Sequence, residues 1–307
     1  MHRSRATAPF FGVLTALLWG ANLQRLLALK DAADPVSVSV AQFHMVFWAA
    51  AGLFGLLLLT GRIGEVAVFG RRETSFLLLA ATGGYGFWVL RGIALEAAGA
   101  AALPYLYAAP LAILLLSLLT SERVGGGGVI GLLLGFVGCF VLAYARADAS
   151  GVVGVGPKVK ALSAAACWAA FSVLARPLVR EEKALPTAAI VTAVGAACLL
   201  VTCLSQGLSV FGISPGQMVG LAVAGFLTVG VMMALWLACL SAAPAARAAP
   251  YWYLGAAFGL FWAWRAGVHV RVWWALLGSV LILSALQLTS EREHGDGAIS
   301  FGDIIRG

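Results

Sequence analysis

The sequence predicts an all-α integral membrane protein in which ten transmembrane helices form two inverted repeats of five. Its 307 residues are 62% hydrophobic and only 11% charged, with a mean hydropathy of +0.96. A soluble domain of this length needs far more charge to cover its surface. The apolar runs are continuous, whereas the strands of a membrane β-barrel alternate apolar and polar residues. Two short segments also recur at nearly the same spacing, which indicates an internal duplication.

The ten predicted spans are apolar runs separated by short breaks. Each is roughly 20 residues long, which is enough to cross a bilayer core of about 30 Å. The predicted ranges are 8–29, 36–60, 74–95, 99–119, 126–145, 157–178, 185–205, 216–240, 244–264 and 269–289.

Most of the breaks are polar, but two are tight alanine-rich turns at 97–102 and 242–249. We divide the chain into a first repeat at 1–147, a second at 148–289 and a polar cytoplasmic tail at 290–307.

The internal duplication rests on two echoes. Pro104-Tyr105-Leu106-Tyr107 recurs 146 positions later as Pro250-Tyr251-Trp252-Tyr253. Leu17-Leu18-Trp19-Gly20-Ala21 is similar to Ala166-Cys167-Trp168-Ala169-Ala170, whose tryptophan lies 149 positions further on. Because five spans is an odd number, the second copy must enter the membrane in the opposite direction. Inverted repeats of this kind are typical of secondary transporters, whose substrate site lies near the midplane between the repeats.

The distribution of lysine and arginine sets the expected orientation. With the N-terminus inside, the inner segments carry 12 of these residues and the outer segments 6. The positive-inside rule therefore predicts a multi-pass protein of the inner (plasma) membrane with both termini in the cytoplasm. The net charge of +7 is explained by this topology and by anionic headgroups, so we expect no nucleic-acid partner.

Several segments resemble the drug/metabolite transporter superfamily of the EamA type. They are Leu17-Leu18-Trp19-Gly20-Ala21-Asn22 in span one, Ser121-Glu122-Arg123 after span four, and the glycine-rich run Gly131-Leu132-Leu133-Leu134-Gly135 with Gly138. The resemblance implies a ten-helix fold and secondary transport, commonly export of amino acids, metabolites or drugs. The chain departs from the family pattern at Trp264-Arg265-Ala266-Gly267, where the family usually repeats a Gly-Glu-Arg turn.

The repeated aromatic segments supply the first candidate site residues. Tyr105 and Tyr107 are two positions apart and point about 160° apart on a helix, so both cannot face one cavity. The same holds for Tyr251 and Tyr253. We expect one tyrosine of each pair to line a central cavity and bind substrate. The alternative is that these tyrosines are packing or interfacial aromatic residues.

Span one and its symmetry mate supply the next candidates. Trp19 and Asn22 are three positions apart and share a helix face. The Asn22 amide lies deep enough to need a partner, either across a cavity or on a neighbouring helix. Trp168 corresponds to Trp19 in the second repeat.

Spans two and three contribute aromatic and ionisable candidates. Tyr85 and Trp88 are three positions apart in a glycine-rich stretch, which predicts a binding wall. Arg91 and His44 fall in the outer part of the predicted bundle, where a positive charge would attract a carboxylate. The alternatives are that Arg91 reaches to the outer headgroups and that His44 is a hydrogen-bonded packing residue.

Nothing in the sequence predicts a catalytic, metal or cofactor site. All five cysteines fall inside apolar runs without a CxxC pair or a nearby histidine at ligand spacing. None of the four histidines pairs with an acid in a motif-like spacing.

We therefore expect a secondary transporter, and an exporter, of small organic metabolites such as amino acids, working by alternating access. Its expected partners are this substrate and the lipid bilayer. Proton coupling and the choice between monomer and homodimer stay open. The alternatives are a transporter-like scaffold or sensor without flux and a membrane-embedded enzyme acting on lipid-linked substrates.

Overall fold

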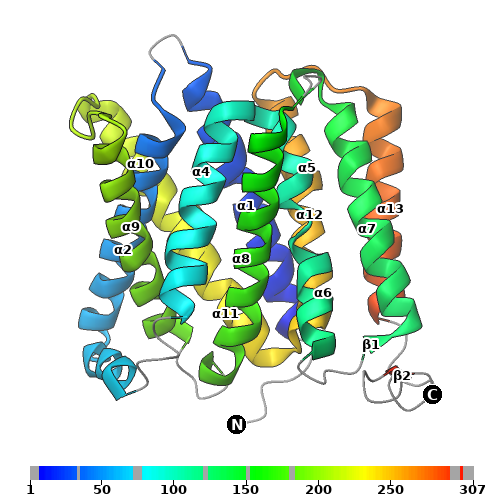
Figure 1. Ribbon diagram of the computed structural model, residues 1–307, viewed down its shortest axis with the longest axis horizontal. Coiled ribbons are helices and arrows are strands. Elements are labelled where there is room, and N and C mark those ends of the chain that lie inside the picture. The colour runs from blue at the N-terminus through cyan, green and yellow to red at the C-terminus, as the bar shows by residue number, and fades with distance from the viewer. Residues whose placement is uncertain are drawn as a thin grey trace.

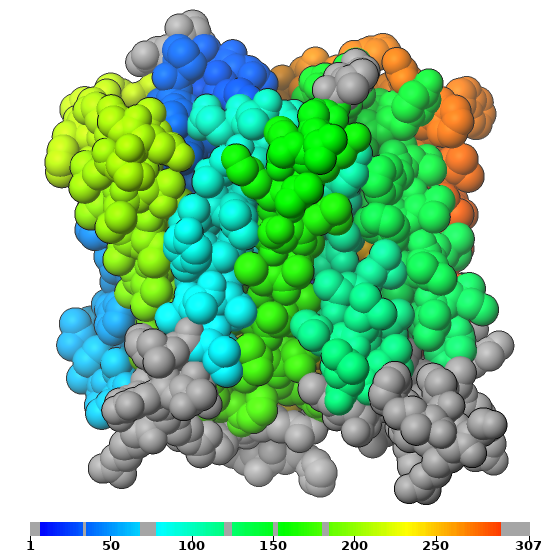
Figure 2. Space-filling view, in the orientation of Figure 1, coloured from blue at the N-terminus to red at the C-terminus, as the bar shows by residue number. Residues whose placement is uncertain are grey.

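The structure, a computed structural model, describes residues 7–32, 35–71, 78–119, 124–149, 153–179, 184–290 and 298–299. The described chain is almost entirely helical, and its long helices run side by side in one bundle (Figure 1). On the face shown in Figure 2, the side chains of the cyan and green helices α4 and α8 pack against each other along their length.

The long helices are α1 (Thr7–Lys30), α2 (Val38–Leu59), α4 (Phe87–Ala98), α6 (Ala109–Leu119), α7 (Gly126–Ala145), α8 (Val155–Val179), α9 (Ala184–Ser205), α10 (Pro215–Gly225), α11 (Met232–Ala242), α12 (Ala245–Arg265) and α13 (Val272–Ser290). The shorter elements are α5 (Leu103–Leu106), the 3-10 helices η1 (Ile63–Arg71), η3 (Gly99–Ala102) and η4 (Ala147–Ala149), the π-helices η2 (Ala80–Gly86) and η5 (Phe226–Val231), and the strands β1 (Val124–Gly125) and β2 (Ala298–Ile299).

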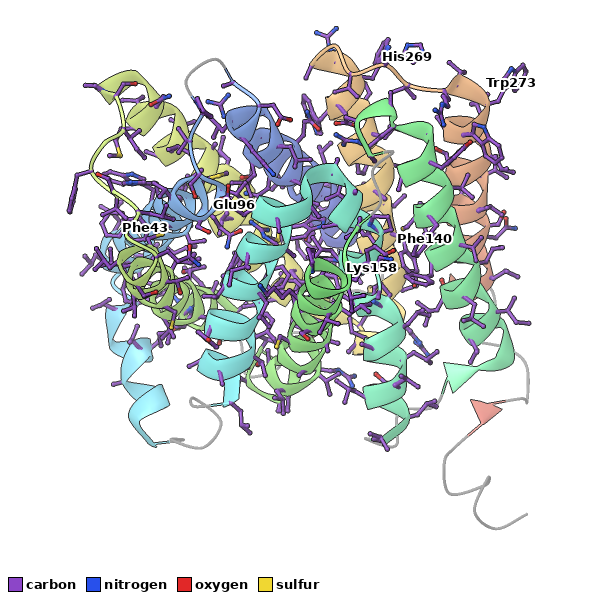
Figure 3. The ribbon with its side chains drawn as sticks, turned by 45° about the horizontal axis from the view of Figure 1, so that its top comes forward. Phe43, Glu96, Phe140, Lys158, His269 and Trp273 are labelled. Atoms are coloured by element: carbon purple, nitrogen blue, oxygen red, sulfur yellow. The ribbon has the colours of Figure 1, made fainter. Side chains whose placement is uncertain are left out.

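Eight helical segments of the described chain are long and apolar enough to cross a membrane, so the protein is a helical membrane protein, as predicted. They are Thr7–Lys30, Val38–Leu59, Ala80–Leu106, Gly126–Ala145, Val155–Val179, Ala184–Ser205, Pro215–Ala242 and Val272–Thr289. Their outer faces carry large apolar side chains such as Leu59 and Val272. Trp273, which is 82% exposed, points away from the end of α13 (Figure 3), as expected of an aromatic side chain at a membrane–water interface.

The region predicted as one span at 99–119 is broken into three pieces. Gly99 adopts a positive φ of 53° and ends α4. The short helices η3 and α5 follow, and a turn at Tyr107 separates α5 from α6. Pro110 lies in the first turn of α6, where its missing N–H costs least. The proline therefore favours a new helix start at this point over a continuous helix.

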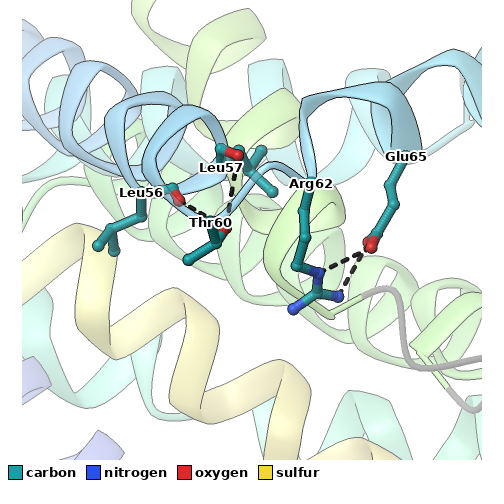
Figure 4. Close-up of polar contacts among 5 residues, drawn as sticks. All are labelled: Leu56, Leu57, Thr60, Arg62 and Glu65. Atoms are coloured by element: carbon teal, nitrogen blue, oxygen red, sulfur yellow. Dashed lines mark hydrogen bonds and ion pairs between the residues drawn. The ribbon is translucent and has the colours of Figure 1, made fainter.

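The C-terminal end of α2 shows how the apolar helices finish at a polar edge. Thr60 donates its hydroxyl to the carbonyl oxygen of Leu56 at 2.7 Å (Figure 4). Arg62 then forms an ion pair with Glu65 of η1 at 2.7 Å. This edge is exposed, and the pair adds little to stability because solvent screens it.

Small residues allow α1 and α12 to cross closely at the centre of the bundle. A Cβ on Gly20 would lie 2.5 Å from the backbone nitrogen of Gly259 and 2.9 Å from the carbonyl oxygen of Gly255. Since both atoms belong to the backbone, neither can rotate away. The crossing therefore requires glycine at position 20.

Two predicted features lie largely outside the described residues. These are the family-like turn at 121–123 and most of the predicted tail at 290–307. Three residues of that tail are described. Ser290 ends α13, and Ala298 and Ile299 form β2, which pairs antiparallel with β1.

Replacing Gly20 with alanine should destabilise the protein by about 1–3 kcal/mol, because the added methyl group overpacks the α1–α12 crossing. Gly55, in α2, is the matched control, since a Cβ there meets nothing within 4 Å. Thermal unfolding in detergent should give a lower Tm for Gly20→Ala and an unchanged or higher Tm for Gly55→Ala. Equal Tm values would contradict the close crossing.

Candidate functional site

The centre of the bundle holds a group of buried aromatic side chains, here called the aromatic cluster. It comprises Trp19 from α1, Phe87 and Trp88 from α4, Trp168 from α8, Trp236 from α11 and Trp252 from α12. Each is at most 2% exposed.

Three tryptophans form the middle of the aromatic cluster. The ring centroid of Trp252 lies 4.5 Å from that of Trp19 and 4.5 Å from that of Trp168. Trp19 and Trp168, the predicted symmetry mates, are 6.5 Å apart and inclined by only 15°. Contacts of this kind contribute about 0.5–1.5 kcal/mol each beyond the burial of their area. The sequence echo at Trp19 and Trp168 therefore brings together two residues of one site.

Arg91 places a positive charge against this cluster. Its guanidinium carbon lies 4.8 Å from the Trp19 ring centroid and 4.8 Å from that of Trp88. The side chain is 0% exposed, so it does not reach the headgroups, and that alternative is wrong. Its Nε donates to Oε1 of Gln42 at 2.9 Å. Gln42 in turn donates its Nε2 to the carbonyl oxygen of Trp88, which fixes the amide.

The outer nitrogens of Arg91, Nη1 and Nη2, have no hydrogen-bond partner among the described residues. Other buried polar atoms without partners lie on the same group of residues. They are the indole nitrogens of Trp88, Trp168 and Trp252 and the side-chain oxygen of Asn22. An unpaired buried charge costs several kcal/mol, and each unpaired neutral group costs about 1–3 kcal/mol. Such a concentration of unpaired polar atoms is typical of a site that a ligand completes.

Asn22 forms the interhelical hydrogen bond considered for it. Its Nδ2 donates to the hydroxyl of Thr228 in η5 at 3.0 Å, which is an interhelical hydrogen bond. Its Oδ1 remains unpartnered and is fully buried. One side of the amide therefore holds η5 against α1, and the other keeps an acceptor free.

Of the first tyrosine pair, Tyr107 faces inward and Tyr105 does not. Tyr107 is 2% exposed and lines a small cavity of about 20 Å³ with Gln24, Cys139 and Arg146. Tyr105 is partly buried at the side of the bundle, with its ring centroid 5.7 Å from that of Phe140. The opposed directions match the two-residue spacing.

The second tyrosine pair packs away from the aromatic cluster. The hydroxyl of Tyr253 donates to the carbonyl oxygen of Leu132 in α7 at 2.8 Å. Tyr251 packs against Gly12 in α1. The residue between them, Trp252, lies in the cluster instead. The expectation that a tyrosine of this copy faces the centre is therefore corrected to the neighbouring tryptophan.

Two further expectations differ from the structure. Tyr85 is 51% exposed, whereas Trp88 is fully buried, so they do not share a wall. Tyr85 belongs to the π-helix η2, whose wider turns end the three-residue periodicity of an α-helix. His44 bonds through Nε2 to the carbonyl oxygen of Val210 at 2.8 Å and packs against Phe43. This histidine is a hydrogen-bonded packing residue rather than a neighbour of Arg91.

Sequence reasoning missed four residues of the site: Gln42, Phe87, Trp236 and Trp252. Gln42 could have been identified from the sequence, because an uncharged amide inside an apolar run also needs a partner. Trp252 carried a weaker signal, because it replaces Leu106 of the first copy.

Among the described residues, no group of three or more His, Cys, Asp or Glu side chains could hold a metal ion. The five cysteines are free thiols, of which Cys139, Cys203 and Cys239 are buried.

Comparison with known proteins gives the fold and no more. No family model matches the chain, and no curated protein matches it significantly. One similar solved structure, described only as "Crystal structure of protein", has a TM-score of 0.79 over 96% of this chain and 100% of the other. At 21% sequence identity, this likeness establishes a shared fold.

The hydrogen bond between Arg91 and Gln42 leads to a prediction about thermal stability. Arg91→Met removes a buried charge together with ring contacts that are worth about 2 kcal/mol or more each when desolvated. Replacing a buried charged group by an apolar side chain of similar volume is often neutral or stabilising. We expect an unchanged or higher Tm. Gln42→Leu leaves the charge and removes its one acceptor, so the Tm should fall.

The double variant Gln42→Leu/Arg91→Met should recover most of the loss caused by Gln42→Leu alone, because the unpaired charge is gone. A fall in Tm for Arg91→Met as large as that for Gln42→Leu would mean that Arg91 is a structural residue.

Proposed function

We propose that this protein is a secondary transporter of the drug/metabolite transporter type. It moves small organic metabolites, such as amino acids, across the cytoplasmic membrane by alternating access. On this proposal, ten membrane helices form two inverted repeats of five, and the aromatic cluster with Arg91 is the substrate site between them. The family resemblance favours export as the direction.

Features that recur at one offset support the duplication. The π-helices η2 and η5 begin at Ala80 and Phe226, 146 residues apart. Gly61 and Gly207, also 146 residues apart, follow α2 and α9 and both have a φ of 69°. The aromatic segments that begin at Pro104 and Pro250 have the same spacing. Shared backbone features at equal spacing are expected of two copies of one fold.

The helix contacts support a two-fold arrangement. α2 packs against α9, and α7 packs against α13, which pairs the second and fifth helices of each repeat with their counterparts. α1 packs against α11 and α12, while α8 packs against α4, α5 and α6. Each first helix therefore contacts the third and fourth helices of the other repeat, as an axis between the repeats requires.

The observation that carries the proposal is the buried Arg91 guanidinium, whose Nη1 and Nη2 have no hydrogen-bond partner among the described residues. Trp19 and Trp88 on either side of it come from the first repeat, and Trp168 and Trp252 come from the second. The position 146 residues after Arg91 is Leu237, which is also buried. The charge of Arg91 therefore has no counterpart in the other copy. A buried charge inside a membrane helix is costly, which favours a functional role for it over a purely structural one.

The closed packing around Arg91 favours alternating access over a static pore. The guanidinium is fully enclosed, and the cavity beside Tyr107 has about 20 Å³, room for only about one water molecule. A metabolite could reach the site only if the repeats moved apart on one side. A scaffold or sensor without flux would not need this motion, so a measurement of flux distinguishes a transporter from a scaffold or sensor.

Counterflow in proteoliposomes tests the proposal, with a pool of labelled amino acids and organic acids measured with and without a pH gradient. Arg91→Gln should reduce saturable flux at least tenfold, because ligand pairing with a buried charge is lost. Arg265→Gln is the control, since Arg265 is exposed at the end of α12 and its loss should leave flux unchanged. Absence of flux for the whole pool, from folded wild-type protein, would contradict transport.

A further inference from the structure

We infer that the ligand of the Arg91 site is an organic carboxylate with a flat apolar body and no amino group. The inference rests on the proposed function. It narrows the substrate class from small organic metabolites to monocarboxylate anions and excludes amino acids from that class.

The first argument is the charge of the site. The described acidic side chains are Asp31, Glu65, Glu96 and Asp148. All lie in loops, 3-10 helices or the last turn of a helix. Glu96 accepts hydrogen bonds from the Ser37 hydroxyl at 2.8 Å and the Ser39 backbone N–H at 3.3 Å, and Figure 3 shows it at the end of α4. None of the four pairs with Arg91, so an anionic ligand is needed to neutralise it.

The same charge balance disfavours an amino group on the ligand. A zwitterionic amino acid would place an ammonium group close to Arg91, with no described carboxylate in contact with the site to balance it. The unpartnered acceptor that α1 offers, Oδ1 of Asn22, is neutral. Burying a second unpaired cation beside the first would cost several kcal/mol. A carboxylate without an amine carries no such cost.

The second argument is the geometry of the unpaired donors. Gln42 occupies the Nε of Arg91, whereas Nη1 and Nη2 are both free. These two nitrogens present parallel N–H bonds, which match the two oxygens of one carboxylate. The tryptophan faces around them suit a flat apolar body, which would stack on the indole rings.

The third argument is a second guanidinium on the route outward. Arg146 lines the small cavity beside Tyr107 and is 4% exposed. Its Nε and Nη2 donate to the two carboxylate oxygens of Asp148 at 2.9 and 2.6 Å, and its Nη1 donates to Gln24 at 3.2 Å.

Asp148 connects this pair to a wider cavity. It lines a second cavity of about 300 Å³, together with Lys30, Asp31 and the turn at Gly99. The Arg146–Asp148 ion pair therefore separates the outer cavity from the space beside Tyr107. A ligand carboxylate that replaces Asp148 on Arg146 would open this barrier, and Arg91 is the next free guanidinium inward.

Binding to a matched set of compounds tests the inference on the purified full chain, by isothermal titration and tryptophan fluorescence. The probes are 3-phenylpropionate (acid), phenylalanine (zwitterion), phenethylamine (cation) and methyl 3-phenylpropionate (neutral ester). We expect the acid to bind at least tenfold more tightly than the other three. Arg91→Gln should abolish the preference for the acid, and Arg91→Lys should retain part of it. Arg265→Gln should bind like the wild type.

Asp148→Asn adds a kinetic test of the outer barrier. The substitution removes the negative charge that pairs with Arg146, so 3-phenylpropionate should associate faster than with the wild type. The part of its affinity that depends on Arg91 should not change. Phenylalanine binding equal to or tighter than acid binding would overturn the inference, and its saturable counterflow would leave transport intact. Acid binding without counterflow would support the inference and contradict transport. Folded protein that binds none of the four probes would overturn the inference.

Discussion

The structure depends on how one buried arginine is accommodated in an apolar bundle. Among the described residues, Arg91 has a single side-chain acceptor, Gln42, and its guanidinium carbon lies 4.8 Å from the ring centroids of Trp19 and Trp88. These contacts recover only part of the cost of taking a guanidinium out of water. The remaining desolvation cost comes from Nη1 and Nη2 of Arg91, which have no hydrogen-bond partner among the described residues. On the proposed function, an anionic ligand that pairs with these nitrogens would recover this cost on binding.

Close helix packing keeps this centre closed. Gly20 allows α1 to touch the backbone of α12. Gly255 leaves room for the edge of the Trp19 indole, and Gly195 does the same for Trp88. At Gly255 and Gly195, the absence of a side chain leaves space for a ring of the aromatic cluster. Because these contacts cross between elements that the proposal assigns to different repeats, separation of the repeats would expose the rings and Arg91 together.

Hydropathy predicted the helical membrane class. The sequence also singled out Trp19, Trp168 and Arg91, which the structure brings together at the centre of the bundle. Three details could not be predicted, each for a physical reason. The π-helix η2 turns Tyr85 outward, and amino-acid composition does not predict a π-helix. In a run of three aromatic residues, only tertiary packing decides that Trp252 faces the centre. The partner of Arg91 lies 49 residues away in sequence, which no local spacing reveals.

The most direct measurement is an experimental structure of the protein with 3-phenylpropionate bound. The account predicts that the carboxylate lies about 2.7–2.9 Å from Nη1 and Nη2 of Arg91, with the phenyl ring against the indole rings of the aromatic cluster. A ligand bound elsewhere, with Arg91 paired to a carboxylate of the protein itself, would contradict the account.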